Sequence, residues 1–205
     1  MKKTLLFILA ALIILTGCAQ GAKYLEGGDD TPLLTADGDV LLTIKDYNRL
    51  VCENELQHEL LGQDRSTQDE LFTTAAEYAL CARFAEDFGA QADIETLYSE
   101  YDSYLSDLKT NLDNTTLNYL SELKKELDMD DDALRDWTVY ETYKQRCCED
   151  LIENISKNYS GLTDTAAMEE AVLSNLQQLA DMYEINCSFE GFENKTFDFK
   201  NILKL

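Results

Sequence analysis

Apolar residues recur at alternating spacings of three and four along most of this chain, and that periodicity limits its fold more than any other feature. It is clearest after Asp93, where one helix face would carry Ile94, Leu97, Tyr98, Tyr101, Leu105, Leu108 and Leu112. Proline, which interrupts helices, occurs only at Pro32. The sequence therefore predicts a mainly α protein, with about six amphipathic helices in one domain.

Capping residues indicate where these helices begin and end. Thr43 and Thr67 each precede an acidic residue by three positions, Asp46 and Glu70, as in a capping box. We expect helices over about 43–61, 67–88, 93–110, 117–127, 133–160 and 164–184. The acidic segment 128–132 before the fifth helix is interpreted as an N-terminal cap.

Short strands are expected at both ends of the domain. Asp37-Gly38 separates the apolar runs 33–36 and 40–43, which favours a hairpin with a type I′ turn or a single strand. Residues 196–200 alternate between polar and aromatic side chains, so the sequence also allows a C-terminal strand, which could pair with the hairpin and close the domain.

The first residues have the pattern of an export signal. Lys2 and Lys3 precede an apolar run from Leu5 to Leu15, which is shorter than the roughly 20 residues of a membrane-spanning helix. The sequence Leu15-Thr16-Gly17-Cys18 resembles the lipobox of bacterial lipoproteins. The alternative is an ordinary secretory signal that contains a coincidental cysteine.

The lipobox resemblance implies that Cys18 becomes the new N-terminus and carries a diacylglycerol whose acyl chains, such as palmitate, anchor it in the membrane. The mature protein would then lie on the outer face of the bacterial cytoplasmic membrane. The expected organisation is a lipoprotein signal peptide over 1–17, a flexible tether over 18–32 and a helical domain over 33–205.

The charge of the chain excludes several classes of partner. Removal of residues 1–17 deletes two lysines and no acidic residue, which takes the formal net charge from −23 to −25. Such a chain lacks the clustered basic residues that bind nucleic acid or anionic lipid. We expect membrane attachment through the lipid anchor only.

We find no set of residues that indicates an enzyme or a cofactor other than the diacylglycerol on Cys18. His58 is the only histidine, and neither a phosphate-binding loop nor a metal-binding motif is present. The remaining cysteines are interpreted as small buried residues; they are Cys52, Cys81, Cys147, Cys148 and Cys187. One disulfide that involves Cys52, Cys81, Cys147 or Cys187 is the alternative.

The order of these features resembles the N-terminal chaperone domain of exported foldases of the SurA and PrsA type. The resemblance covers about residues 38–159: a strand and helix at 38–47, an alanine-bearing helix that ends at Phe88-Gly89, a long helix capped by Asp93, a short leucine helix and an acidic turn at 129–135. The parvulin-type isomerase domain of those foldases has no counterpart after Gly161. The resemblance implies binding of unfolded polypeptides without prolyl isomerase activity.

Aromatic residues on the expected helices are the candidates for such binding, although aromatic residues at helical spacing often belong to the core. The candidates are Tyr98, Tyr101, Tyr104, Trp137, Tyr140 and Tyr143. We therefore expect a chaperone-like protein that holds unfolded exported polypeptides. The alternative is a structural or adaptor lipoprotein that docks one dedicated protein partner.

Overall fold

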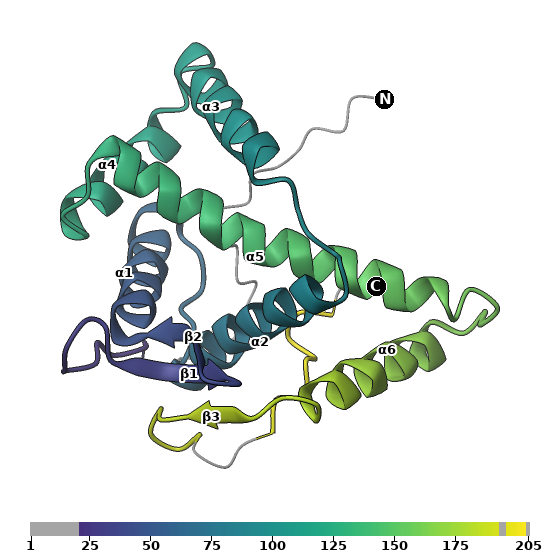
Figure 1. The fold of residues 1–205 in the computed structure, drawn as a ribbon. Helices are drawn as coiled ribbons and strands as arrows, with labels where there is room; N and C mark the ends of the chain where they lie inside the picture. The colour runs from purple at the N-terminus through teal and green to yellow at the C-terminus, as the bar shows by residue number, and fades with distance from the viewer. Residues whose placement is uncertain (1–20, 193–195, 204–205) are drawn as a thin grey trace.

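The computed structural model describes residues 21–192 and 196–203 and confirms a mainly α fold with short strands (Figure 1). The elements in these residues are β1 (Pro32–Ala36), β2 (Asp39–Thr43), α1 (Ile44–Leu61), α2 (Gln68–Asp87), α3 (Ile94–Thr110), α4 (Asn114–Glu126), α5 (Asp131–Lys157), α6 (Thr165–Ala180) and β3 (Ile185–Cys187). None of the described helices is both long enough and apolar enough to cross a lipid bilayer.

The predicted caps define the helix boundaries. Thr43 and Thr67 form complete capping boxes, in which each hydroxyl accepts a backbone N–H and the acidic side chain three residues later accepts the threonine N–H. Helix α1 ends at Gly62, whose φ of 69° is left-handed, as a glycine stop requires. Asp130 caps α5, as the acidic segment before it predicted.

The expected hairpin is present, and it carries a third strand. Strands β1 and β2 are antiparallel, and both turn residues have positive φ, 52° at Asp37 and 87° at Gly38. Strand β3 pairs antiparallel with the other edge of β1, so the order in the sheet is β2-β1-β3. The C-terminal part of the chain therefore does pair with the hairpin.

The strand expected at 196–200 is wrong in position, because β3 lies at Ile185–Cys187. Phe197 and Phe199 are both buried, which explains the alternating pattern, but their backbone is irregular. Phe199 has a φ of 57° and donates its N–H to Glu77 Oε1 at 2.8 Å instead of to a neighbouring strand. The alternating pattern therefore reflects burial of both rings in the core, where Phe199 lies edge-on to Phe84 of α2.

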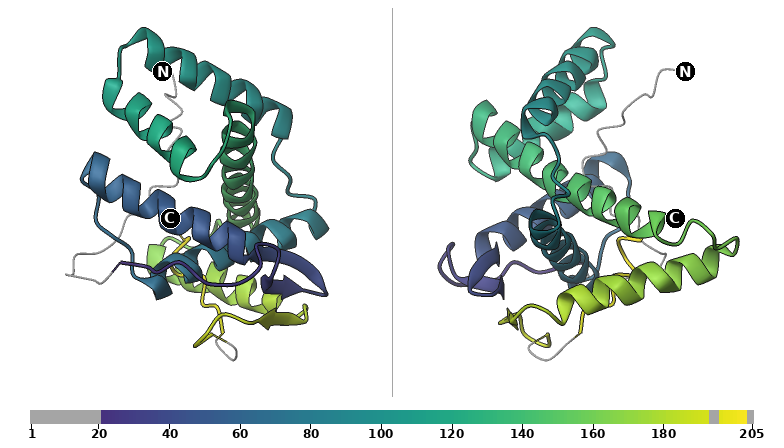
Figure 2. Two further views of the ribbon diagram at one scale, coloured as in Figure 1. Left: turned by 90° about the vertical axis from the view of Figure 1, so that its left-hand side faces the viewer. Right: turned by 45° about the vertical axis from the view of Figure 1, so that its right-hand side comes forward.

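The helices form a body and a projecting arm (Figures 1 and 2). In the body, α2 packs against α5 at the centre, α1 and the sheet lie beside α2, and α6 contacts both central helices. In the arm, α3 and α4 pack against each other, α3 lies on the N-terminal half of α5, and α4 contacts α1. Helix α5 is therefore common to the body and the arm.

Part of the segment expected as a tether makes specific contacts with α1. Asn48 accepts the N–H of Leu25 at 2.8 Å and donates its side-chain amide to the carbonyl of Leu25 at 3.0 Å. Thr31 accepts the N–H of Ile44 at 3.0 Å, and Ala22 is buried. The rest of that segment, 18–20, and Cys18 with the signal peptide lie outside the described residues, as do 193–195 and 204–205.

Candidate functional site

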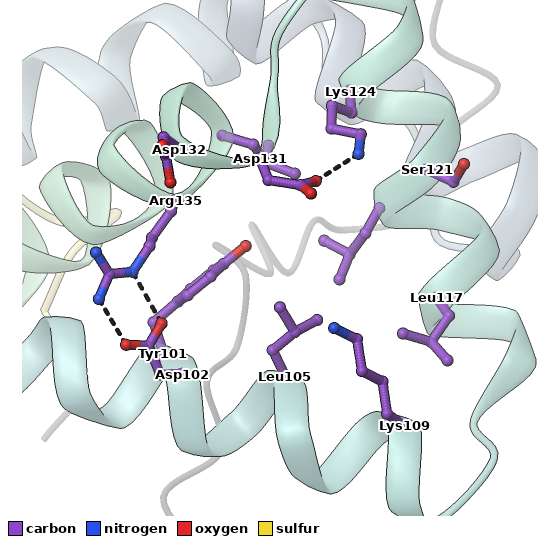
Figure 3. A pocket seen from close by; sticks show the side chains of 12 residues that line it. Tyr101, Asp102, Leu105, Lys109, Leu117, Ser121, Lys124, Asp131, Asp132 and Arg135 are labelled. Atoms are coloured by element: carbon purple, nitrogen blue, oxygen red, sulfur yellow. Dashed lines mark hydrogen bonds and ion pairs between the residues drawn. The ribbon is translucent and has the colours of Figure 1, made fainter.

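A cleft of about 400 Å³ lies between α3, α4 and the first turns of α5 (Figure 3). Its floor is apolar and takes side chains from all three helices: Tyr101, Leu105, Leu117, Leu120 and Leu134. Leu112 has a φ of 54° in the turn after α3, where the chain reverses direction and brings α4 back beside α3. The volume falls within the range of about 300–1,000 Å³ that is typical of ligand pockets.

Charged side chains surround this floor (Figure 3). Arg135 of α5 donates two hydrogen bonds to Asp102 of α3, Nε to Oδ1 at 2.8 Å and Nη2 to Oδ2 at 2.6 Å. On the opposite side, Lys124 of α4 donates to Asp131. These pairs connect the arm helices to α5 at either side of the opening.

Three cations line this cleft, and two of them, Lys124 and Arg135, form ion pairs. Within residues 21–192 and 196–203, Lys109 has no such ion pair with a carboxylate. Its ammonium group points into the cleft beside Leu105 (Figure 3). A chain with a net charge of −23 thus places Lys109, Lys124 and Arg135 around one apolar depression. An apolar segment that carries a carboxylate or exposed backbone carbonyls would complement this arrangement.

The contacts of the cleft residues shift the pKa values of three of them. The hydrogen bond from Lys124, and then its charge, lower the pKa of Asp131, and the charge of Lys109 lowers it further. The hydrogen bond to Asp102 raises the pKa of Arg135. Burial raises the pKa of Tyr101, so its hydroxyl stays neutral in the cleft. Asp131 and Arg135 therefore both stay charged near neutral pH.

The six aromatic candidates lie in different parts of the structure. Tyr101 is the one that lines the cleft. Tyr98, Tyr104 and Tyr143 are partly buried around a small cluster between α3 and α5, which contains Tyr101 itself, Leu97 and Val139. These aromatic side chains attach the arm to α5.

The two remaining candidates lie outside that cluster. Trp137 is buried in the main core, with 6% of its surface exposed. Tyr140 is 52% exposed, stacks on Tyr143 with ring centroids 6.5 Å apart, and has the Lys144 ammonium 5.1 Å from its ring centroid. The six residues therefore do not line one continuous groove.

Sequence reasoning missed most residues of the cleft. The spacing of Leu105 and Leu117 places them on the apolar faces of two helices, but it does not show that those faces leave a gap between them. Lys109 offered a weak signal, as a cation near the end of a helix in an acidic chain. The gap itself depends on how α3 packs on α5 while α4 packs on α1.

A second, more polar hollow of about 520 Å³ lies between α1, α4 and Tyr24. Its charged lining residues are Glu59, Glu122 and Glu126, and Cys52 lies at its inner side. Burial raises the pKa of the Cys52 thiol. We regard the cleft on α3, α4 and α5 as the better candidate site, because it combines an apolar floor with cations.

Comparison with protein-family models, with curated proteins and with solved structures found no match. Among the residues that the structure describes, no group of three or more histidine, cysteine or acidic side chains is placed to hold a metal ion.

Proposed function

We propose that this protein is a lipid-anchored, chaperone-like holdase that binds unfolded exported polypeptides in the cleft between α3, α4 and α5, without isomerase activity. The observation that supports this most directly is the apolar floor that the cleft exposes between packed helices. Helical arms with such clefts can hold apolar segments reversibly, because binding removes apolar surface from water without a requirement for one sequence.

The charged residues around the apolar floor are consistent with an extended polypeptide as the ligand. Apolar side chains of a client would contact Leu105 and Leu117 on the floor, and its carbonyl or carboxylate oxygens would accept hydrogen bonds from Lys109. The high negative charge of the rest of the chain keeps the complex soluble while the apolar contact persists.

The proposed location rests on the lipobox-like segment and has its own test. Cys18→Ser removes the thiol that the diacylglycerol would modify, so the variant should move from the membrane fraction to the soluble fraction of the host cell. Its circular dichroism should match that of the wild type. A variant that stays in the membrane fraction would contradict the lipid anchor.

The binding proposal is tested by suppression of aggregation. The mature protein should keep an unfolded, acidic client in solution at near-equimolar ratio, and the acidic client avoids nonspecific attraction to this acidic chain. Leu105→Asp or Leu117→Asp should reduce this suppression of aggregation about tenfold or more, because each substitution places a carboxylate on the apolar floor.

The matched control is Leu162→Asp, which changes a 40% exposed leucine in the α5–α6 connection. It should suppress aggregation as well as the wild type does. Equal activity in the three leucine variants, or no suppression by the folded wild type, would contradict the proposal. Capture of one stoichiometric folded partner from detergent-solubilised membranes would instead favour an adaptor lipoprotein.

A further inference from the structure

The three cations of the cleft differ in the partners that they already have. Arg135 donates two hydrogen bonds to Asp102, and Lys124 donates to Asp131. Lys109 has no ion pair with a carboxylate in the part of the chain that the structure describes, and its side chain is exposed. Of these three cations, Lys109 is therefore the one that can bind a new carboxylate without losing an existing partner.

Lys109 lies on the same face of α3 as part of the apolar floor. Leu105 precedes it by four residues, so the two side chains are neighbours about 6 Å apart along the helix axis. The Lys109 ammonium lies beside Leu105 and points into the cleft (Figure 3). The cleft thus offers an apolar contact and a contact for an anion next to each other.

An extended polypeptide presents side chains at a spacing that matches these two contacts. Side chains two positions apart lie on the same face of an extended chain, roughly 6.8 Å from each other. An apolar client side chain that packs on Leu105 therefore brings the side chain two positions away close to Lys109. A carboxylate there accepts a charge-assisted hydrogen bond, which is stronger than the bond that a neutral amide or carbonyl accepts.

We propose that the cleft selects client segments in which an aspartate or glutamate lies two positions from a large apolar residue, and that Lys109 determines this specificity by binding the carboxylate. The inference rests on the holdase of the proposed function and names the kind of segment that it takes. With a formal net charge of −23, the chain as a whole repels carboxylates. The described residues that line the cleft instead hold three cations and three aspartates, so an acidic segment can approach it.

The test measures the affinity of defined peptides for the full protein, purified from host membranes in detergent, by fluorescence anisotropy. The probes are unstructured, labelled peptides with both ends blocked. One contains leucine and glutamate two positions apart, and the other has glutamine in place of glutamate. The wild type should bind the glutamate peptide about two- to fivefold more tightly, as expected for one exposed ion pair. A rise in ionic strength from about 0.05 M to about 0.5 M should remove this preference.

Variants of one side chain assign the preference. Lys109→Gln should bind both peptides equally well, whereas Lys109→Arg should keep the preference, because arginine retains the charge and its favourable place in the last turn of α3. Lys109→Glu should instead prefer a peptide with lysine in place of glutamate. The matched control is Lys125→Gln, which removes the same charge from α4 outside the cleft and should keep the preference of the wild type.

Equal affinity of the wild type for the glutamate and glutamine peptides would overturn the inference. It would also be overturned by a preference that survives in Lys109→Gln or disappears in Lys125→Gln. A third peptide carries a free terminal carboxylate in place of the glutamate side chain. It should bind less tightly than the glutamate peptide, and tighter binding would show that the cleft takes chain ends instead.

The aggregation assay separates this result from the proposed function. A protein that suppresses aggregation but binds the two peptides equally contradicts the preference alone. A folded protein that neither suppresses aggregation nor binds either peptide contradicts the holdase, and the preference with it.

Discussion

Replacement of the buried Glu53 by glutamine should remove a large part of the pH dependence of stability. Glu53 is 5% exposed on α1, and its Oε1 accepts hydrogen bonds from Gln57 at 3.1 Å and from the Tyr119 hydroxyl at 3.3 Å. Burial, and then the charge of Glu141 on α5, raise its pKa to about 8. Glu141 itself is paired with Lys144 at 2.7 Å. The folded protein therefore holds a proton on Glu53 at neutral pH.

The sign and size of the effect follow from this pKa. The ordinary value is 4.5, so the folded state binds more protons than the unfolded state between pH 4.5 and about 8. The stabilisation by this group is complete below pH 4.5, and it is lost as the pH rises through about 8. Between pH 5 and 8 the loss amounts to roughly 3 kcal/mol. Glutamine has the same shape as the protonated carboxyl group and does not titrate.

The assay is urea unfolding across this pH range, followed by the fluorescence of Trp137, the only tryptophan and a buried one. The wild type should lose roughly 3 kcal/mol more than Glu53→Gln as the pH rises from 5 to 8. Glu77, whose pKa burial raises to about 7, titrates in both proteins and cancels in the difference. Glu59→Gln, which changes an exposed carboxylate on the same helix, should behave as the wild type. Identical pH dependence in wild type and Glu53→Gln would refute the reasoning.

Two further perturbations have defined outcomes in thermal or urea unfolding. Thr67→Ala should cost about 1 kcal/mol, since it removes the capping box of α2; an unchanged midpoint would contradict that role. Leu123→Ala should cost about 2–5 kcal/mol, because its side chain is fully buried between α4 and the core; a loss below about 1 kcal/mol would show that the site collapses.

Helix starts and the hairpin turn could be predicted from the sequence, because they depend on residues that are close together in the chain. Thr43 with Asp46 predicts a helix start because a hydroxyl and a carboxylate three residues apart can satisfy the free N–H groups of the first turn. Asp37-Gly38 predicts the hairpin because its turn needs two residues with positive φ. Both motifs act over a few residues, so no knowledge of the rest of the fold is needed.

Features that depend on tertiary packing could not be predicted from the sequence. The alternation at 196–200 is real, but it arises because Phe197 and Phe199 enter the core, which an irregular segment achieves as well as a strand does. The cleft likewise depends on the separation of three helices.

The position of β3 beside β1 has a consequence for the order in which the chain folds. The third strand and the aromatic residues that follow it complete a core whose other half comes from the first third of the chain: Phe189 stacks on Phe72 with ring centroids 4.0 Å apart and contacts Tyr47 at 5.1 Å. These contacts span most of the sequence, so they form late and slowly. Because a polypeptide is synthesised from its N-terminus, Tyr47 and Phe72 are available long before Phe189. Until Phe189 is also available, both rings lack the partner that covers them in the folded protein.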